Sequence, residues 1–310
     1  MTGLCFVWGL QQIAIKAIAS SVSPLLQVAL RSAIAAVIVF IVGRFFMREP
    51  WLRGVWKGAM LVAVLFAAEF YFVAEGLRYT SAAHMAVFLY TAPIFAAFGL
   101  HLAIKHERLT GMQWSGVLIA FLGITVTFLG PSMTTPASMA NKAGMWGDVL
   151  GLCAGAAWGF TTVTVRASRL SEAPAIQTLF YQLAGGGLLL LPLAVLTGQN
   201  TFQPATLAIV SLAFQTIVVS VISYLTWFWM LKHYLASRLG ILSFMTPMFG
   251  VALGALLLNE HVGGWFVVGS MITLAGMLVV NAHGLLRTMG RLRRNREPAQ
   301  HLPRPQRIDG

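Results

Sequence analysis

The sequence predicts an all-α membrane protein in which ten transmembrane helices form two five-helix repeats of inverted topology. Three observations lead to this fold class: the composition of the chain, the spacing of its apolar runs and an internal duplication. Of the 310 residues, 58% are hydrophobic and only 10% are charged, whereas soluble domains average about 25% charged residues. A water-soluble fold of this length would need far more polar surface, so the composition places the chain in a bilayer.

The apolar runs recur at roughly the 20 residues that one helix needs to cross the hydrocarbon core. We predict ten spans, at residues 3–19, 25–43, 56–76, 82–104, 112–130, 146–165, 176–196, 206–230, 237–258 and 264–285. The first run has only seven residues before Trp8, so either further sequence precedes Met1 or this helix barely reaches the cytoplasmic face. It also lacks a basic leader and a small-residue cleavage site, so we expect no signal peptide.

Two stretches of the chain match each other at an almost constant separation. The matching residues are Leu77, Ala82, Pro93, Glu107, Gly116 and Gly123 in the first half, and Leu231, Ala236, Pro247, Glu260, Gly269 and Gly276 in the second. The offset is 154 positions for the first three pairs and 153 for the others. Trp8-Gly9 and Lys16 recur as Trp158-Gly159 and Arg166, at an offset of 150. Such a duplication is typical of carriers that build two half-gates around one binding site.

A polar segment separates the two repeats. We predict a first repeat over residues 1–130, a linker over 131–145 and a second repeat over 146–286, because Pro, Ser, Thr and Asn in the middle segment are typical of linkers. Five spans is an odd number, so the second repeat must enter the membrane from the opposite side, which makes the topology inverted. Residues 287–310 are rich in Pro and Arg without apolar periodicity and are predicted to be a disordered cytoplasmic tail.

The basic residues are distributed unequally between the two predicted sides of the membrane. Seventeen of the 21 Lys and Arg residues fall on the side that carries both termini, three fall on the other side, and Arg31 lies inside a span. The positive-inside rule makes the richer side cytoplasmic, which predicts a bacterial inner-membrane protein with both termini in the cytoplasm. The net charge of +12 therefore favours anionic lipid headgroups as the partner of the tail, and nucleic acid is the weaker interpretation.

Catalytic and metal-binding motifs are absent from the sequence. HExxH, GxSxG, GxxxxGK[ST] and GxGxxG do not occur, so neither ATP binding nor metal-dependent hydrolysis has support. Cys5 and Cys153 stand alone in apolar runs and are most simply packing residues. We predict no enzyme activity, no cofactor and no metal site.

Ionisable groups at membrane depth are costly and usually face the bundle interior or a water-filled cavity. Glu69 is the strongest example. It can form a structural ion pair with Lys16 or Arg31, bind a substrate ammonium or carry a proton. Lys16 can extend to the headgroups or attract a carboxylate, and His84 can be a hydrogen-bonded structural residue or part of a proton relay.

Aromatic and amide side chains recur on the faces of several spans, and ligand sites are mostly apolar with a few placed polar groups. Trp and Tyr also form belts at the membrane interface, so packing competes with binding at each position. The candidate cavity residues are Trp8, Gln12, Lys16, Glu69, His84, Tyr90, Trp158, Thr162, Tyr181, Gln215, Tyr224 and Trp227.

Pro93 and Pro247 occupy matching places within predicted spans. Each removes an amide donor and clashes with the preceding turn, so we expect a kink. A kink can serve shape alone, but a matched pair in inverted repeats favours a hinge or gate. The four-residue spacing of Gly151, Gly155 and Gly159 indicates close helix packing.

The recurring residues resemble the EamA repeat of the drug/metabolite transporter superfamily over nearly all of residues 1–286. In the first half the resemblance is carried by Trp8-Gly9, Lys16, Pro24, Arg31, Leu77-Arg78-Tyr79-Thr80-Ser81-Ala82, Pro93, Glu107-Arg108-Leu109, Gln113, Gly116 and Gly123. In the second half it is carried by Trp158-Gly159, Arg166, Pro247, Glu260, Gly269 and Gly276. Two features depart from the pattern: Gln182 stands where Arg31 stands in the first half, and the first helix is short.

The overall pattern looks most like bacterial inner-membrane exporters of aromatic amino acids, the YddG type. This resemblance implies ten helices around a central cavity and export by alternating access of amino acids, aromatic or large neutral ones, and related small metabolites. Trp8, Trp158, Tyr224 and Trp227 would then supply apolar surface. Gln12, Gln215 or Lys16 would meet a carboxylate, and Glu69 or an aromatic face would meet an ammonium.

Other functions stay open at the level of sequence. Efflux of cationic drugs through Glu69 is the alternative within transport, and a non-transporting membrane scaffold or a membrane-embedded enzyme is the alternative from another class. The expected partners are a small-molecule substrate and the lipid bilayer, with no nucleic acid and a monomer as the working unit. The sequence does not decide between proton coupling and facilitated diffusion.

Overall fold

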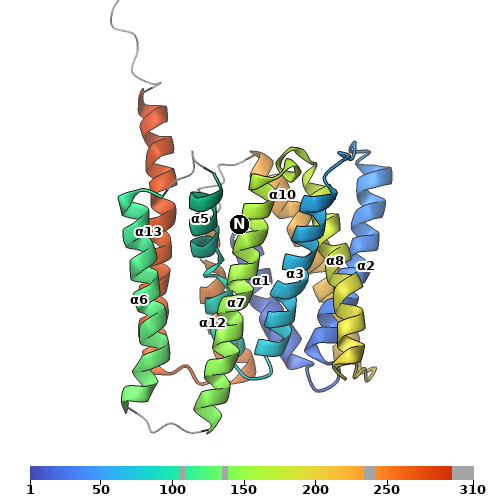
Figure 1. The fold of residues 1–310 in the computed structure, drawn as a ribbon. Helices are drawn as coiled ribbons and strands as arrows, with labels where there is room; N and C mark the ends of the chain where they lie inside the picture. Colours follow the sequence, from blue (N-terminus) through green and yellow to red (C-terminus); the bar gives the residue numbers. More distant parts are fainter. Residues whose placement is uncertain (105–108, 135–138, 234–241, 244, 295–310) are drawn as a thin grey trace, which may run out of the picture.

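The computed structural model describes residues 1–104, 109–134, 139–233, 242–243 and 245–294, and over these residues it is helical between its turns. The long helices stand side by side and run between the upper and lower ends of the molecule in Figure 1. One isolated antiparallel β-bridge joins Val22 to Phe202 within the described residues.

The helices of the first half follow one another with short connections. They are α1 (Thr2–Ala17), α2 (Pro24–Ile41) with its π-helical continuation η1 (Val42–Phe46), α3 (Trp56–Gly76), α4 (Ala82–Leu89), α5 (Ala92–Ala103) and α6 (Gly111–Thr134).

The second half contains α7 (Met139–Ala167), a short 3₁₀ turn η3 (Arg169–Glu172), α8 (Ala175–Leu196) and α9 (Thr206–Ala213). It continues through the π-helix η4 (Phe214–Ser223) directly into α10 (Tyr224–His233), and after residues outside the described part come α12 (Met245–Leu258) and α13 (Gly264–Arg294).

Six helical segments in the described part of the chain are long and apolar enough to cross a membrane. They are Pro24–Phe46, Trp56–Gly76, Ala82–Ala103, Ala143–Ala167, Ala175–Leu196 and Thr206–Trp227. Three of the other predicted spans correspond to shorter apolar helices, at Gly111–Thr127, Met245–Leu258 and Gly264–Val280, and the remaining one corresponds to the 16-residue α1. The chain is therefore a multi-pass helical membrane protein.

The helix ends near the two prolines show where the predicted kinks lie. Pro93 is not in the middle of a continuous helix: α4 ends at Leu89, Tyr90 and Thr91 interrupt the span, and Pro93 is in the first turn of α5. Pro247 is the third residue of α12. Both prolines thus occupy the first turn, where the missing amide would have no intrahelical partner.

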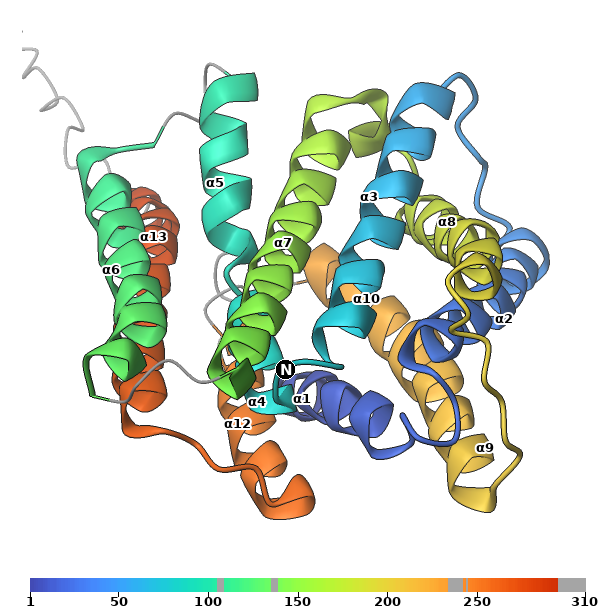
Figure 2. The same cartoon turned by 60° about the horizontal axis from the view of Figure 1, so that its bottom comes forward.

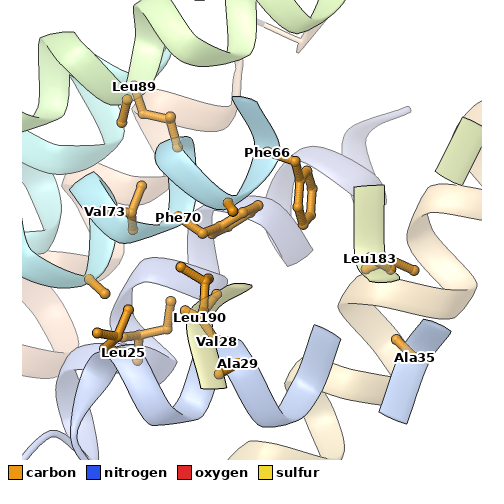
Figure 3. Close-up of a cluster of buried hydrophobic side chains, with 14 of the residues drawn as sticks. Leu25, Val28, Ala29, Ala35, Phe66, Phe70, Val73, Leu89, Leu183 and Leu190 are labelled. Atoms are coloured by element: carbon orange, nitrogen blue, oxygen red, sulfur yellow. The ribbon is translucent and has the colours of Figure 1, made fainter. Parts of the chain in front are cut away.

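The apolar core lies between α2, α3 and α8 (Figure 3). Leu25, Val28, Phe70 and Leu190 are almost completely buried there. The close approach of α8 to α2 depends on glycine, because a Cβ atom on Gly187 would lie 2.8 Å from the Cα atom of Ala33. Small residues of this kind are what let helix backbones approach in a membrane.

The helices of the two halves pair across the molecule. α1 packs against α12, and α7 packs against α4 and α5, while α2 pairs with α8 and α3 contacts both α7 and α8. The matched glycines lie in these contacts: a Cβ atom on Gly9 would lie 2.9 Å from the Cβ atom of Phe249, and one on Gly159 would lie 2.7 Å from that of Phe95. Phe95 and Phe249 are themselves 154 positions apart.

α6 and α13 form a pair at one edge of the molecule, and both views show them side by side (Figures 1 and 2). The matched glycines of the two halves meet in this pair. A Cβ atom on Gly116 would lie 2.8 Å from the carbonyl oxygen of Gly276, and one on Gly123 would lie 2.6 Å from that of Gly269.

Helix extends beyond two predicted boundaries. α6 continues to Thr134 and α7 already begins at Met139, so most of the predicted linker 131–145 is helical and residues 135–138 lie outside the described part. α13 continues to Arg294, eight residues into the predicted tail. The remainder of that tail and Glu107 lie outside the described residues.

Candidate functional site

Two pockets lie near opposite ends of α2. One of about 680 Å³ is lined by Arg44 of η1, by the loop that follows η1, including Arg48 and Arg53, and by Gln177 and Tyr181 of α8. The other, of about 540 Å³, lies where α2 begins and is lined by Lys16 and Arg78 among others. Lys16 and Arg78, which loop charge assigns to one side, therefore lie near the opposite end of α2 from Arg44, Arg48 and Arg53.

Two charged side chains are buried between these ends. Arg31 of α2 is 1% exposed and Glu69 of α3 is 7% exposed. The guanidinium carbon of Arg31 lies 4.4 Å from the ring centroid of Phe70, and Arg31 interacts electrostatically with Tyr224 and Glu69. We call Arg31, Glu69, Phe70 and Tyr224 the interior cluster.

Arg31 makes few direct polar contacts in this cluster. Its Nε and Nη1 atoms are buried and have no hydrogen-bond partner among the described residues. The ion pairs found within 4.0 Å in the described part of the chain do not include one between Arg31 and Glu69. The structural ion pair considered for Glu69 is thus a longer-range attraction, and both groups keep capacity for another partner.

A polar seam runs beside the interior cluster, where α1 and α2 meet η4. Gln27 donates through Nε2 to the carbonyl oxygens of Ile15 (3.0 Å) and Val22 (2.8 Å), and its Oε1 accepts from Nε2 of Gln215 at 3.0 Å. The Oε1 atoms of Gln12 and Gln215 are buried without a partner in the described residues. Unpaired acceptors of this kind cost free energy unless a ligand or water satisfies them.

The seam includes a π-helix that the sequence did not reveal. η4 covers ten residues, Phe214–Ser223, although π-helices are rare and occur mostly as single turns at functional sites. Its last residue, Ser223, accepts a hydrogen bond from Nε1 of Trp8 at 2.9 Å. No glycine or proline interrupts this segment, so the usual signal of an irregular helix is missing.

Four predicted aromatic residues form two pairs, each joining the two halves of the chain. Trp8 of α1 contacts Trp227 of α10 edge to face, with centroids 5.5 Å apart. Trp158 of α7 contacts Tyr90, at the break between α4 and α5, with centroids 5.2 Å apart. Tyr90 is also within electrostatic range of Tyr224 and Glu69. The structure therefore brings Trp8, Trp227, Tyr90, Trp158, Tyr224 and Glu69 into one region.

Lys16 is not a partner of Glu69. Its Nζ atom lies 3.3 Å from Oε1 of Glu260 and donates to the carbonyl oxygen of Thr80 at 2.6 Å. Glu260 accepts from the backbone amides of Ala82 (2.8 Å) and Ala83 (3.0 Å), so it caps α4. We call Lys16, Thr80, Ala82, Ala83 and Glu260 the α4 network.

His84 belongs to a second set of contacts at the same end of the molecule. Its Nδ1 atom lies 2.9 Å from Oδ2 of Asp148 on α7, and its ring stacks on Phe266 with centroids 3.8 Å apart. Asp148 also accepts from the hydroxyl of Thr80. Asp148 is not among the site residues predicted from the sequence, although it is the one acidic residue of the predicted sixth span.

The remaining candidates lie elsewhere or bond within their own helix. Tyr181 lines the pocket beside the η1 loop and accepts from Nε2 of Gln177 at 2.9 Å. The hydroxyl of Thr162 donates to the carbonyl oxygen of Trp158 at 3.4 Å. Within the described residues no group of three or more His, Cys, Asp or Glu is arranged to hold a metal ion.

Comparison with known proteins identifies the family of this chain. The EamA-like transporter family matches residues 1–129 and 145–282. A solved crystal structure has the same fold, with a TM-score of 0.62 at 19% sequence identity, and the match covers 93% of this chain and 96% of that one.

Curated relatives carry transporter names. A protein of Escherichia coli described as a "probable amino-acid metabolite efflux pump" is 26% identical over 90% of this chain and 92% of its own length. An "uncharacterized transporter" of Bacillus subtilis is 22% identical, covering 88% and 92% of the two chains. A chloroplastic WAT1-related protein of Arabidopsis thaliana is 28% identical over 89% of this chain and 67% of its own length.

Proposed function

The chain belongs to the EamA-like transporter family, and we propose that it is a secondary transporter that exports amino acids, aromatic or large neutral ones, and related small metabolites. The observation that carries this proposal is the interior cluster, in which Arg31 and Glu69 are buried without a close ion pair beside two aromatic pairs. Charged groups inside a membrane bundle mark solute pathways. The name of the Escherichia coli relative supports amino acids as the substrate class.

We further propose that the two halves are inverted repeats that work by alternating access. Equivalent contacts on the two sides of the molecule support this: Gly9 packs on Phe249 as Gly159 packs on Phe95. The reciprocal contacts of matched glycines between α6 and α13 support it as well. A twofold relation between the halves would explain this pattern, because Gly159 is the counterpart of Gly9 and Phe249 is the counterpart of Phe95.

The α4 network is proposed as the closed periplasmic gate. It joins α1, α4 and the segment after α12 through charged and capping contacts. The pocket beside the η1 loop lies at the other, Arg-rich end, which the positive-inside rule makes cytoplasmic. Export would require the α4 network to open while the Arg-rich end closes, in a bacterial inner membrane with both termini in the cytoplasm.

The chemistry of the site favours large side chains. Trp8, Trp158, Tyr224 and Trp227 are each partly exposed, so their rings keep surface for an aromatic or aliphatic ligand. A mainly apolar site discriminates by only about 1–3 kcal/mol per methylene, so several large neutral amino acids would share it. The unpaired Oε1 atoms of Gln12 and Gln215 add acceptors for an ammonium group.

The direct test is counterflow of labelled phenylalanine and tryptophan in proteoliposomes that hold the monomeric protein. We expect flux well above that of empty vesicles. Trp8→Ala should lower it about tenfold, the equivalent of about 1.4 kcal/mol for a lost aromatic contact. Trp114→Ala is the matched control, because Trp114 lies on α6 and contacts Phe98 and His101, away from the interior cluster.

The same vesicles separate the competing functions. Flux no greater than in empty vesicles removes the amino-acid proposal. Transport of organic cations without amino acids, lost in Glu69→Gln, would establish cationic drug efflux in its place. An imposed pH gradient that changes the flux would show proton coupling, whereas an unchanged flux would show facilitated diffusion.

A further inference from the structure

We propose that Arg31 binds the carboxylate of the transported solute and that Glu69 binds its ammonium, so that the site selects zwitterionic amino acids over simple amines and simple acids. The inference rests on the proposed function and deepens it by assigning the charged ends of the substrate. It also replaces Lys16 as a candidate for the carboxylate.

The state of the Arg31 side chain is the first argument. Its side chain is among the largest that are fully buried in the described part of the chain. Two of its nitrogens, Nε and Nη1, nevertheless have no hydrogen-bond partner there. A buried polar group normally has a partner, and the guanidinium group is the side chain best suited to bind a carboxylate. A buried guanidinium with two unpaired nitrogens is therefore prepared for an anionic ligand.

The competing cation, Lys16, already has partners. Lys16 is held by Glu260 and by the carbonyl oxygen of Thr80, in the α4 network at one end of the molecule. Binding a substrate carboxylate there would require Lys16 to give up both partners. Arg31 would lose no hydrogen bond through its Nε and Nη1 atoms.

Charge balance is the third argument. The interior cluster contains one basic side chain, Arg31, and one acidic side chain, Glu69, and no ion pair within 4.0 Å joins them. A zwitterion inserted between them gives each buried charge an opposite partner and leaves the total charge unchanged. A simple cation would satisfy Glu69 alone and place a further positive charge near Arg31, which is unfavourable in a low-dielectric interior.

The duplication gives a fourth argument. The offset of 150 that relates Lys16 to Arg166 places Tyr181 of α8 opposite Arg31, with Gln182 as the next residue, and α2 and α8 pack against each other. The second half thus has no cation at the position that matches Arg31. A single cation near the contact of the two halves allows one carboxylate, and it fixes the direction in which an amino acid binds.

Equilibrium binding to the purified full-length protein tests the assignment. Three labelled ligands share one ring: phenylalanine, 2-phenylethylamine, which lacks the carboxylate, and 3-phenylpropionate, which lacks the ammonium. The wild type should bind phenylalanine at least tenfold more tightly than either analogue. Arg31→Gln should weaken phenylalanine at least tenfold and leave the amine unchanged or tighter. Glu69→Gln should weaken phenylalanine similarly and leave the acid unchanged or tighter.

Matched variants keep the test decisive. Lys57→Gln removes a cation from the exposed start of α3 and should change none of the affinities. If a single variant does not fold, the charge-neutral double variant Arg31→Gln/Glu69→Gln replaces it and should bind the three ligands within about threefold of one another. Equal losses for phenylalanine and the amine in Arg31→Gln, or none, would overturn the role of Arg31. A wild type that moves no amino acid in counterflow would remove the proposed function instead.

Discussion

Glu260 is a residue whose position is set locally and whose partners are distant. It follows Asn259, which has a positive φ of 51° at the end of α12, a conformation that asparagine tolerates better than most residues. The amide of Glu260 donates to the carbonyl oxygen of Gly254 at 3.2 Å. Its carboxylate then reaches the start of α4, where Ser81 already accepts from the amide of His84. Together these acceptors satisfy the first amides of α4.

Glu260→Ala should open the α4 network. It removes an ion pair and two charge-assisted capping bonds, so we expect the closed arrangement to lose about 2 kcal/mol, or roughly 30-fold in its population. Lys16→Met should have a smaller effect, because the amides of Ala82 and Ala83 keep their acceptor. The measurement is the distance distribution between spin labels at the exposed positions Ser20 and His261, with Cys5 and Cys153 replaced.

Glu75→Ala provides the comparison for this prediction. Glu75 also forms an ion pair near this end of the molecule, with Arg78 at 2.9 Å, and the neighbouring carboxylate raises the pKa of Arg78 above its usual value. It caps no amide of α4, so its loss should leave the distance distribution unchanged. A distribution that is the same in Glu260→Ala and the wild type would show that the network does not hold the gate closed.

The sequence identified individual residues of the site better than it identified their partners. Glu69, Trp8 and Tyr224 stand out because polar and aromatic groups in apolar runs are visible without a structure. Lys16 was a candidate for the cavity, yet its partner Glu260 is 244 positions away, and no local pattern encodes such a pairing. Arg31 was visible as a buried charge, but its unpaired nitrogens depend on the packing of α2, α3 and α10.

At the scale of the helix, the contact of α6 with α13 depends on glycine. Gly123→Ala should destabilise the protein by about 1–3 kcal/mol, the usual cost of forcing an extra methyl group into a packed contact. The new Cβ atom would lie 2.6 Å from the carbonyl oxygen of Gly269 and would also meet the backbone of Thr273. Thermal unfolding in detergent measures the effect as a lower midpoint.

The same substitution at Gly144 is the matched control. Gly144 lies in α7, and a Cβ atom there would meet no atom within 4 Å. Alanine favours a helix over glycine by about 1 kcal/mol, so Gly144→Ala should leave the midpoint unchanged or raise it. A midpoint for Gly123→Ala at or above that of the wild type would show that α6 and α13 separate without cost.

Helix type was harder to predict than helix position. The span predicted at 206–230 corresponds to the apolar helical segment Thr206–Trp227, but the same hydropathy fits an α-helix and a π-helix equally. The π-helical register of η4 accompanies contacts with α1 and α2, including the bond between Trp8 and Ser223. Such contacts exist only in the assembled bundle, so a local pattern cannot predict them.

At the scale of the whole molecule, composition and duplication predicted a multi-pass helical protein, and family membership agrees. The boundaries at the linker and tail were less predictable. At the predicted linker and tail, α6, α7 and α13 continue into polar sequence. A helix that leaves the membrane can extend into water without an apolar face. Loop charge predicts the orientation because the bilayer responds to the sum of many residues rather than to one contact.

The excess of Lys and Arg on one side of the membrane predicts the orientation of the protein. Ser171 of η3 lies at the Arg-rich end, where Arg169 approaches Gly54 of the loop after η1. Ser20 follows α1 at the opposite end and lines the pocket that contains Lys16 and Arg78. With Cys5 and Cys153 replaced, a membrane-impermeant maleimide should label Ser20→Cys in intact cells and Ser171→Cys only after permeabilisation.

Both serines are exposed, so a difference in labelling reports the side of the membrane rather than burial. The positive-inside rule depends on the excess of Lys and Arg near the ends of the spans, and seventeen such residues in the loops and tail of one side against three on the other leave one orientation favoured. Labelling of Ser171→Cys in intact cells would reverse it: the α4 network would then face the cytoplasm, and the proposed export would require that network to open for substrate entry instead of release.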